Sequence, residues 1–176
     1  MARYFFAVLS VLLFACLPGC LKPLPDGMPD LVSFQAKVVQ DDKPLEGAHV
    51  VFKGEKNHFL VDGVTDSNGI AQMKTQGKFT GIPCDNYRIS VEKIVRTPSK
   101  YDGIPAPPEE DQKAIDELAK KRAAEYCPTH SYVEAKFGNV KTSGLTVNVD
   151  KAGSVDLNVG KPVDNITIPP GTAAKP

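Results

Sequence analysis

Cysteine and histidine carry the most reactive side chains of this chain, and their spacing is the first test of function. Transition-metal sites need converging ligands, often spaced C-x-x-C or H-x-x-x-H, and the chain contains neither pattern. A G-x-S-x-G motif for a nucleophilic serine is missing as well. The sequence therefore predicts no metal site, no cofactor and no catalytic residue, and we expect a protein that is not an enzyme. The residues concerned are cysteines 16, 20, 84 and 127 and histidines 49, 58 and 130.

Acidic and amide side chains gather around Gly69, where Asp62, Asp66 and Asn68 loosely resemble a calcium-binding EF-hand loop. The spacing argues against that site. Aligning Gly69 with the loop glycine puts Val64 and Thr75 at the first and last ligand positions, where carboxylates are required. We predict a plain turn. A weak cation-binding or small-ligand site in these loops remains the alternative.

The first nineteen residues have the composition of a signal peptide. A single positive charge, Arg3, precedes about a dozen apolar residues, and Pro18 and Gly19 end this stretch before it reaches the length of a spanning helix. The segment LPGC at residues 17–20 resembles the bacterial lipobox, whose cysteine is lipidated and becomes the new N-terminus. The resemblance implies a lipid on Cys20 and removal of residues 1–19; Cys16 lies in a weaker competing match.

A lipid on Cys20 would tether the chain to a membrane, because buried acyl chains contribute about 0.8 kcal/mol per CH₂. Leu21 follows Cys20 where aspartate would signal inner-membrane retention. In a diderm host we therefore expect the outer membrane. Residues 20–30 contain three prolines and are predicted to form an extended tether.

Two cysteines remain once Cys16 is discarded and Cys20 is lipidated. Cys84 and Cys127 would lie in an oxidising compartment, and we predict a disulfide between them. Such a bond closes a loop of about 43 residues, which the chain-entropy model values at about 4 kcal/mol. The alternatives are two unrelated thiols, or a reactive cysteine beside His130.

The chain without residues 1–19 has 20 basic and 21 acidic residues, because Arg3 is the only charge in that segment. This balance gives no indication of nucleic-acid binding. The remaining 157 residues suffice for one domain with a hydrophobic core plus extensions. Fifteen prolines, fourteen glycines and no tryptophan favour a turn-rich β protein.

Apolar and polar residues alternate in several short segments, which indicates strands with one buried face. Turns are predicted at residues 41–44, 66–69 and 151–153. The sequence thus predicts an all-β sandwich domain over residues 31–160. Its seven strands are expected at residues 32–38, 48–52, 59–65, 70–73, 87–91 with a continuation to Arg96, 145–149 and 155–159.

One helical insertion, residues 99–135, precedes the last two strands. A helix is predicted from the acidic residues after Pro107 and Pro108 to about Tyr126. Its apolar stripe is thin, so we expect the helix to lie on the sandwich surface, held there by the bond between Cys84 and Cys127. Residues 161–176 are rich in proline and polar residues and are predicted to be a disordered tail.

Three segments of the sequence resemble the carboxypeptidase regulatory-like, or transthyretin-like, domain family. They are KPLEGAHVVF at residues 43–52, GVTDSNG at residues 63–69 and GIPCDNYRISV at residues 81–91. The segment at residues 136–147, KFGNVKTSGLTV, is similar to one found in small bacterial lipoproteins of this kind. The resemblance implies a seven-stranded Greek-key sandwich and says little of function, because this fold serves many roles.

These observations favour a lipid-anchored, non-enzymatic module of the cell envelope. We expect it to contact an envelope protein or a glycan through its insertion and loops. The alternatives are a weak small-ligand or cation-binding protein and an accessory domain of a partner enzyme.

Overall fold

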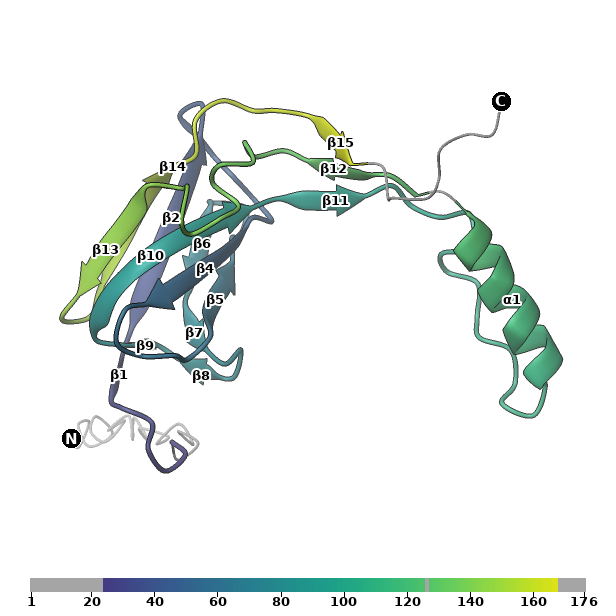
Figure 1. The fold of residues 1–176 in the computed structure, drawn as a ribbon, viewed down its shortest axis with the longest axis horizontal. Coiled ribbons are helices and arrows are strands. Elements are labelled where there is room, and N and C mark those ends of the chain that lie inside the picture. The colour runs from purple at the N-terminus through teal and green to yellow at the C-terminus, as the bar shows by residue number, and fades with distance from the viewer. Residues whose placement is uncertain (1–23, 126, 168–176) are drawn as a thin grey trace, which may run out of the picture.

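A computed structural model describes residues 24–125 and 127–167, which form fifteen strands and one helix. The protein is mostly β, with several antiparallel sheets, consistent with an all-β sandwich. Figure 1 shows two parts: a body of packed sheets and an arm that extends from it to the helix. The lipidation site expected at Cys20 and the end of the expected tail, residues 168–176, lie outside the described residues.

The larger sheet of the body has six strands in the order β13-β10-β4-β5-β7-β8. All of its strand pairs are antiparallel. Its centre is the pair of β10 and β4, which are the longest strands of this sheet. The strands are β4 (His49–Gly54), β5 (Val61–Val64), β7 (Lys74–Thr75), β8 (Phe79–Thr80), β10 (Asp85–Glu92) and β13 (Leu145–Val149).

The second sheet is built around β2, which pairs with β14, β3 and β6. The pair of β14 and β2 is parallel, and the other two pairs are antiparallel. A short separate pair joins β1 to β9. The strands are β1 (Leu31–Val32), β2 (Phe34–Gln40), β3 (Lys43–Pro44), β6 (Ile70–Gln72), β9 (Ile82–Pro83) and β14 (Gly153–Asn158).

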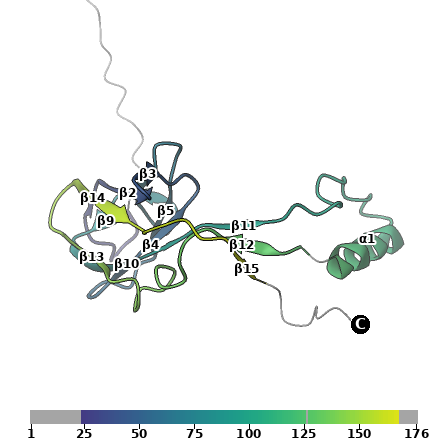
Figure 2. The ribbon, with the colours of Figure 1, turned by 90° about the horizontal axis from the view of Figure 1, so that it is seen from above.

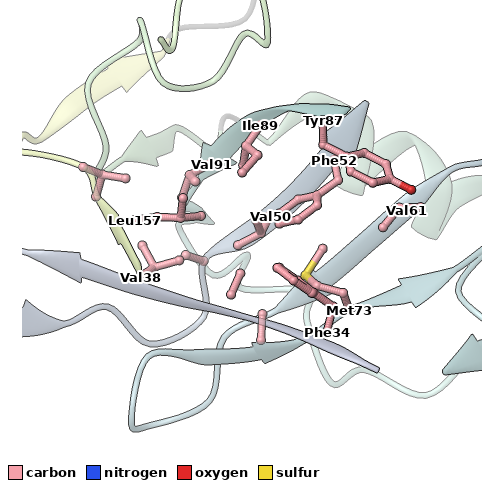
Figure 3. Packing of buried hydrophobic residues seen from close by; sticks show 14 of the residues in the cluster. Phe34, Val38, Val50, Phe52, Val61, Met73, Tyr87, Ile89, Val91 and Leu157 are labelled. Atoms are coloured by element: carbon pink, nitrogen blue, oxygen red, sulfur yellow. The ribbon is translucent and has the colours of Figure 1, made fainter. Parts of the chain in front are cut away.

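The hydrophobic core lies between these two sheets (Figure 3). Alternate residues of β2 and β10 are buried, as period-two patterns predict for strands with one covered face. Phe52 packs against Phe34 and Tyr87 at ring-centroid distances of 6.2 and 5.6 Å. The labelled core residues are Phe34, Val38, Val50, Phe52, Val61, Met73, Tyr87, Ile89, Val91 and Leu157.

The predicted turns occur at the expected residues. Asp41 and Asp42 both have positive φ, as a two-residue hairpin turn between β2 and β3 requires. In the next turn, Asp66 Oδ1 accepts hydrogen bonds from the backbone N–H groups of Asn68 and Ile70, both at 2.9 Å. The Ile70 N–H, chiefly, holds the pKa of Asp66 below its usual value. Gly69 follows with a φ of +74°.

The strands β13 and β14 flank the predicted turn at residues 151–153 and belong to different sheets, because β13 pairs with β10 and β14 pairs with β2. The residues predicted as the start of a disordered tail include β15 (Asn165–Thr167), which pairs with β12 (Thr129–Ser131). A short apolar segment can be ordered by pairing with a distant strand, and no local pattern reports that pairing.

Candidate functional site

The projecting arm is the feature of this molecule that the sandwich core does not explain. It consists of a three-stranded sheet, β11-β12-β15, and of the segment of residues 97–128 at its far end. In β11 (Ile94–Arg96) all three residues are exposed. The backbone continues into this strand from β10, and the arm extends clear of the body in two perpendicular views (Figures 1 and 2).

Strand register divides the arm sheet into two faces. Val95, His130 and Ile166 lie opposite one another in β11, β12 and β15 and therefore share one face. The side chains of the rows on either side, which include Ile94, Ser131 and Asn165, point to the other face. Because no sandwich layer covers the arm, large apolar residues on both of these faces are exposed to solvent.

Exposed apolar side chains are concentrated on the arm. Ile94 is 58% exposed, Val95 45% and Ile166 59%, and Ile104 of the far segment is also exposed. These four are the majority of the large apolar residues exposed in the described part of the chain. The remaining three are Leu24, Leu60 and Val64. Of these four, Val95 and Ile166 share one face of the arm sheet. Apolar side chains exposed together on one face mark a binding site more often than scattered single residues do.

Polar contacts stiffen the face that carries His130. His130 Nδ1 lies 2.8 Å from Asp164 Oδ1, and the His130 ring stacks on Tyr132 at 6.3 Å between centroids. Lys93 Nζ lies 5.8 Å from the centroid of the Tyr132 ring. These contacts join all three strands, because Lys93 precedes β11 and Asp164 precedes β15. The three strands of the arm are therefore held together by contacts among their own residues and the residues next to them.

A hollow of about 310 Å³ lies where the arm joins the body. The arm contributes Ile94, Ser131 and Asn165, and the body contributes Glu92 and Asn139 among others. The walls combine an exposed apolar side chain with hydrogen-bonding groups.

The helix α1 (Gln112–Ala124) lies at the far end of the arm and not on the sandwich surface, so that prediction is wrong. The Asp111 side chain caps its N-terminus by accepting a hydrogen bond from the Ala114 N–H at 3.0 Å. Near its C-terminus, Arg122 donates to the carbonyl oxygens of Tyr101 and Ile104. The helix is thus tied to the preceding loop rather than to the body.

Hydrogen bonds also fold the loop before the helix. Arg96 donates to both carboxylate oxygens of Asp102, at 2.9 and 2.7 Å. The Ser99 N–H and then Arg96 hold the pKa of Asp102 below its usual value. The Ser99 hydroxyl contacts the Glu125 carboxylate just past the helix. The loop and the helix at the far end of the arm are therefore held to each other by hydrogen bonds.

The predicted disulfide is not formed, and both cysteines are free. Cys84 lies at the start of β10, where its thiol contacts the carbonyl of Asp150 at 3.4 Å. Cys127 lies beside Thr97, whose N–H donates to Pro128. The chain between Cys84 and Thr97 is extended through β10 and β11, which puts the two cysteines at opposite ends of these strands. A disulfide needs Cα atoms within about 7 Å.

The other residues considered for chemistry are dispersed. His49 pairs with Asp62 at 3.2 Å on β4 and β5, His58 is in the loop between these strands, and His130 contacts Asp164 on the arm. Within the described ranges, no group of three or more His, Cys, Asp or Glu residues could hold a metal ion. No hydrogen bond joins Cys127 to His130 there.

Sequence reasoning missed a buried carboxylate, Asp85. Asp85 Oδ2 accepts hydrogen bonds from the Lys56 N–H, the Asn57 N–H and Asn57 Nδ2 at 2.6–2.9 Å, and Oδ1 accepts from the Asn86 N–H. Burial alone would raise the pKa of Asp85, but these donors outweigh it and lower the pKa. The sequence could have predicted that Asp85 points inward. Side chains alternate along a strand, and Asp85 is two residues before Tyr87 and four before Ile89, which both face the core.

Tyr87 completes this network. Its hydroxyl donates to the Pro83 carbonyl at 2.7 Å and accepts from Asn57 Nδ2 at 3.1 Å. Burial raises the pKa of Tyr87 to about 12, so the hydroxyl keeps its proton. Asp85 and Tyr87 together fix the loop that follows β4.

In the part of the chain that the structure describes, no helix has the length and apolar character to span a bilayer. The chain matches no protein-family model, no curated protein and no solved structure.

Proposed function

We propose that this chain is a non-enzymatic, lipid-anchored protein of the cell envelope, whose arm binds another envelope protein. The observation that carries the proposal is the arm itself. It projects from the body, exposes Ile94, Val95 and Ile166, and is braced by its own contacts. A protein partner is favoured over a glycan because apolar side chains contribute to binding when another apolar surface covers them.

Division of the chain into a packed body and an arm supports this role. A lipid on Cys20 and the residues that follow it would hold the body at the membrane, and the arm would reach a partner. The body itself is proposed to be a transthyretin-like Greek-key sandwich. In support, its seven longer strands correspond to the seven segments expected from the sequence.

Replacing two apolar residues of one arm face tests the binding proposal. Val95→Ser with Ile166→Ser leaves the core unchanged but removes apolar area on either side of His130. We expect binding to the partner to weaken about 10-fold to 100-fold, from about 1 kcal/mol or slightly more for each side chain. Copurification from the native host measures this, with the partner first identified by a photo-crosslinking residue at position 95 of the otherwise wild-type chain.

Val64→Ser is the matched control, because Val64 is similarly exposed on β5 of the body. It should leave the copurified amount at the wild-type level. Equal recovery of the crosslinked partner with the arm variant and with wild type would contradict the proposal, as would adducts formed from position 64 and not from position 95.

The lipid anchor has its own test, in which Cys20→Ala is compared with Cys16→Ala. Without the Cys20 sulfur no acyl chain can be attached, so we expect Cys20→Ala to accumulate as precursor and to lose fatty-acid labelling. Cys16→Ala should be processed and labelled like wild type. Membrane fractionation with radiolabelled palmitate measures both. Full labelling of Cys20→Ala would overturn the assignment.

A further inference from the structure

A second surface, on the outer face of the six-stranded sheet, carries an excess of positive charge. It is a hollow of about 340 Å³ between β4, β10 and the segment of residues 139–144. We call it the basic groove. Three cations and one carboxylate contribute to its lining, so its balance is positive although the chain as a whole has no net charge. Its residues are Lys53, Gly54, Glu55, Arg88, Val140 and Lys141.

The strand register places two of these cations directly opposite each other. Lys53 of β4 is the cross-strand partner of Arg88 of β10. Like charges in this position destabilise a sheet, since their Cβ atoms are only about 5 Å apart. Glu55 offsets part of this charge, at 3.7 Å from Arg88, but both of these side chains are about half exposed and Lys141 adds a further cation. An anion in the groove would relieve the repulsion.

An apolar hollow adjoins the basic groove and shares Lys53, Gly54 and Val140 with it. Its volume is about 310 Å³, and Val51, Phe59 and Leu60 contribute to its lining. Leu60 is 56% exposed, so apolar area of this hollow is open to solvent. The two hollows together offer positive charge at one end and apolar surface at the other.

Asp85 gives this surface a fixed shape. The carboxylate of Asp85 holds Lys56 and Asn57, which directly follow the groove residues Gly54 and Glu55. The loop after β4, whose residues line both hollows, is therefore anchored to the core by hydrogen bonds of its own. Preformed sites bind with a smaller entropic cost than mobile ones.

We propose that the basic groove binds a small organic oxyanion, a carboxylate or a phosphate monoester, whose apolar part lies across Val140 toward Phe59 and Leu60. Lys53, Arg88 and Lys141 pair with the oxyanion, and the guanidinium of Arg88 suits bidentate contact. This binding function is independent of the arm and goes beyond the proposed function. It requires no metal and no covalent step.

Titration of the mature, lipidated chain in nanodiscs of zwitterionic lipid tests this site, with hexyl phosphate, hexanoate, inorganic phosphate and hexan-1-ol as probes. We expect hexyl phosphate and hexanoate to bind, inorganic phosphate to bind more weakly and hexan-1-ol not to bind. Lys53→Gln and Arg88→Gln should each weaken hexyl phosphate binding about tenfold. Lys43→Gln, on β3 of the other sheet, should not change it.

Two further readouts separate a binding role from a structural one. Lys53→Gln should raise the Tm of the ligand-free protein, because it removes the repulsion with Arg88. Val140→Ser should weaken hexyl phosphate but not inorganic phosphate. Nanodiscs containing anionic lipid show the source of the oxyanion: competition with hexyl phosphate would indicate a lipid headgroup, and its absence a free ligand.

The proposal is overturned if neither organic anion binds at millimolar concentration. It is equally overturned if hexan-1-ol binds as tightly as hexyl phosphate, or if Lys53→Gln and Lys43→Gln have the same affinity. None of these outcomes depends on the partner of the arm, so the groove proposal can fail without affecting the proposal that the arm binds an envelope protein.

Discussion

Gly69→Ala is expected to destabilise the protein by about 3 kcal/mol, through a clash between the new methyl group and β2. A Cβ at Gly69 would lie 2.5 Å from the carbonyl oxygen of Val38 and 3.1 Å from the Leu45 nitrogen. These atoms belong to a hydrogen-bonded arrangement, in which Val38 N–H donates to Gly69 and Leu45 N–H donates to Val38. The backbone at Gly69 also has a φ of +74°, which disfavours alanine.

The two contributions can be separated with Gly77→Ala. Gly77 has a similar φ, +65°, but a Cβ there would meet no atom within 4 Å. This control should therefore show the cost of backbone strain alone, about 1 kcal/mol. Urea denaturation of the two variants measures the difference. Equal midpoints for Gly69→Ala and Gly77→Ala would mean that the turn shifts away from β2 without cost.

Side-chain periodicity allowed most strands of the body to be predicted. Period-two alternation in β2, β10, β13 and β14 reports which side faces the core, and a buried core enforces that pattern. Turn residues were equally informative, because positive φ at Asp41, Asp42 and Gly69 restricts the residue types. Both signals are local, and both depend on physics that acts within a few residues.

The helix of the arm was predicted, but the exposed three-stranded sheet was not, because it breaks the rule on which strand prediction rests. Ile94, Val95 and Ile166 are apolar yet exposed, whereas the pattern treats apolar residues as buried. Pairing of β12 with β15 joins residues 34 or more positions apart, and no local pattern reports it. The disulfide prediction failed for the same reason. Only Cys84 and Cys127 remained as candidates for pairing, but the distance between them depends on the path of β10 and β11, which the sequence does not show.

The basic groove shows the same limit for function. Lys53 and Arg88 each resemble an ordinary exposed residue of an alternating strand. The two residues become cross-strand neighbours only because β4 pairs with β10 in the observed register. Asp85 differs, because its inward parity was visible in the sequence and a buried carboxylate needs donors. A polar residue at an inward position of a predicted strand therefore indicates a buried hydrogen-bond network, and Asp85 could have been predicted on that basis.

Asp85→Asn is expected to destabilise the protein by about 2–3 kcal/mol at neutral pH, because hydrogen bonds to a charged acceptor are lost. The carboxylate accepts three backbone N–H groups and Asn57 Nδ2, and an asparagine amide would present N–H groups to some of these donors. Asp156→Asn is the control, on the exposed side of β14, and should change the free energy of unfolding by less than about 0.5 kcal/mol.

The pH dependence identifies the charge as the cause. In the folded protein the pKa of Asp85 is lower than its ordinary value of 3.8. The unfolded chain therefore takes up a proton first as the pH falls, and the stabilisation by Asp85 is complete above pH 3.8 and is lost as the pH falls through the lower, folded pKa. We expect the difference between wild type and Asp85→Asn, measured by urea denaturation, to stay constant from pH 7 to about pH 5 and to shrink below pH 3.8. A difference that persists undiminished to pH 2 would show that Asp85 stabilises the loop by its shape and not by its charge.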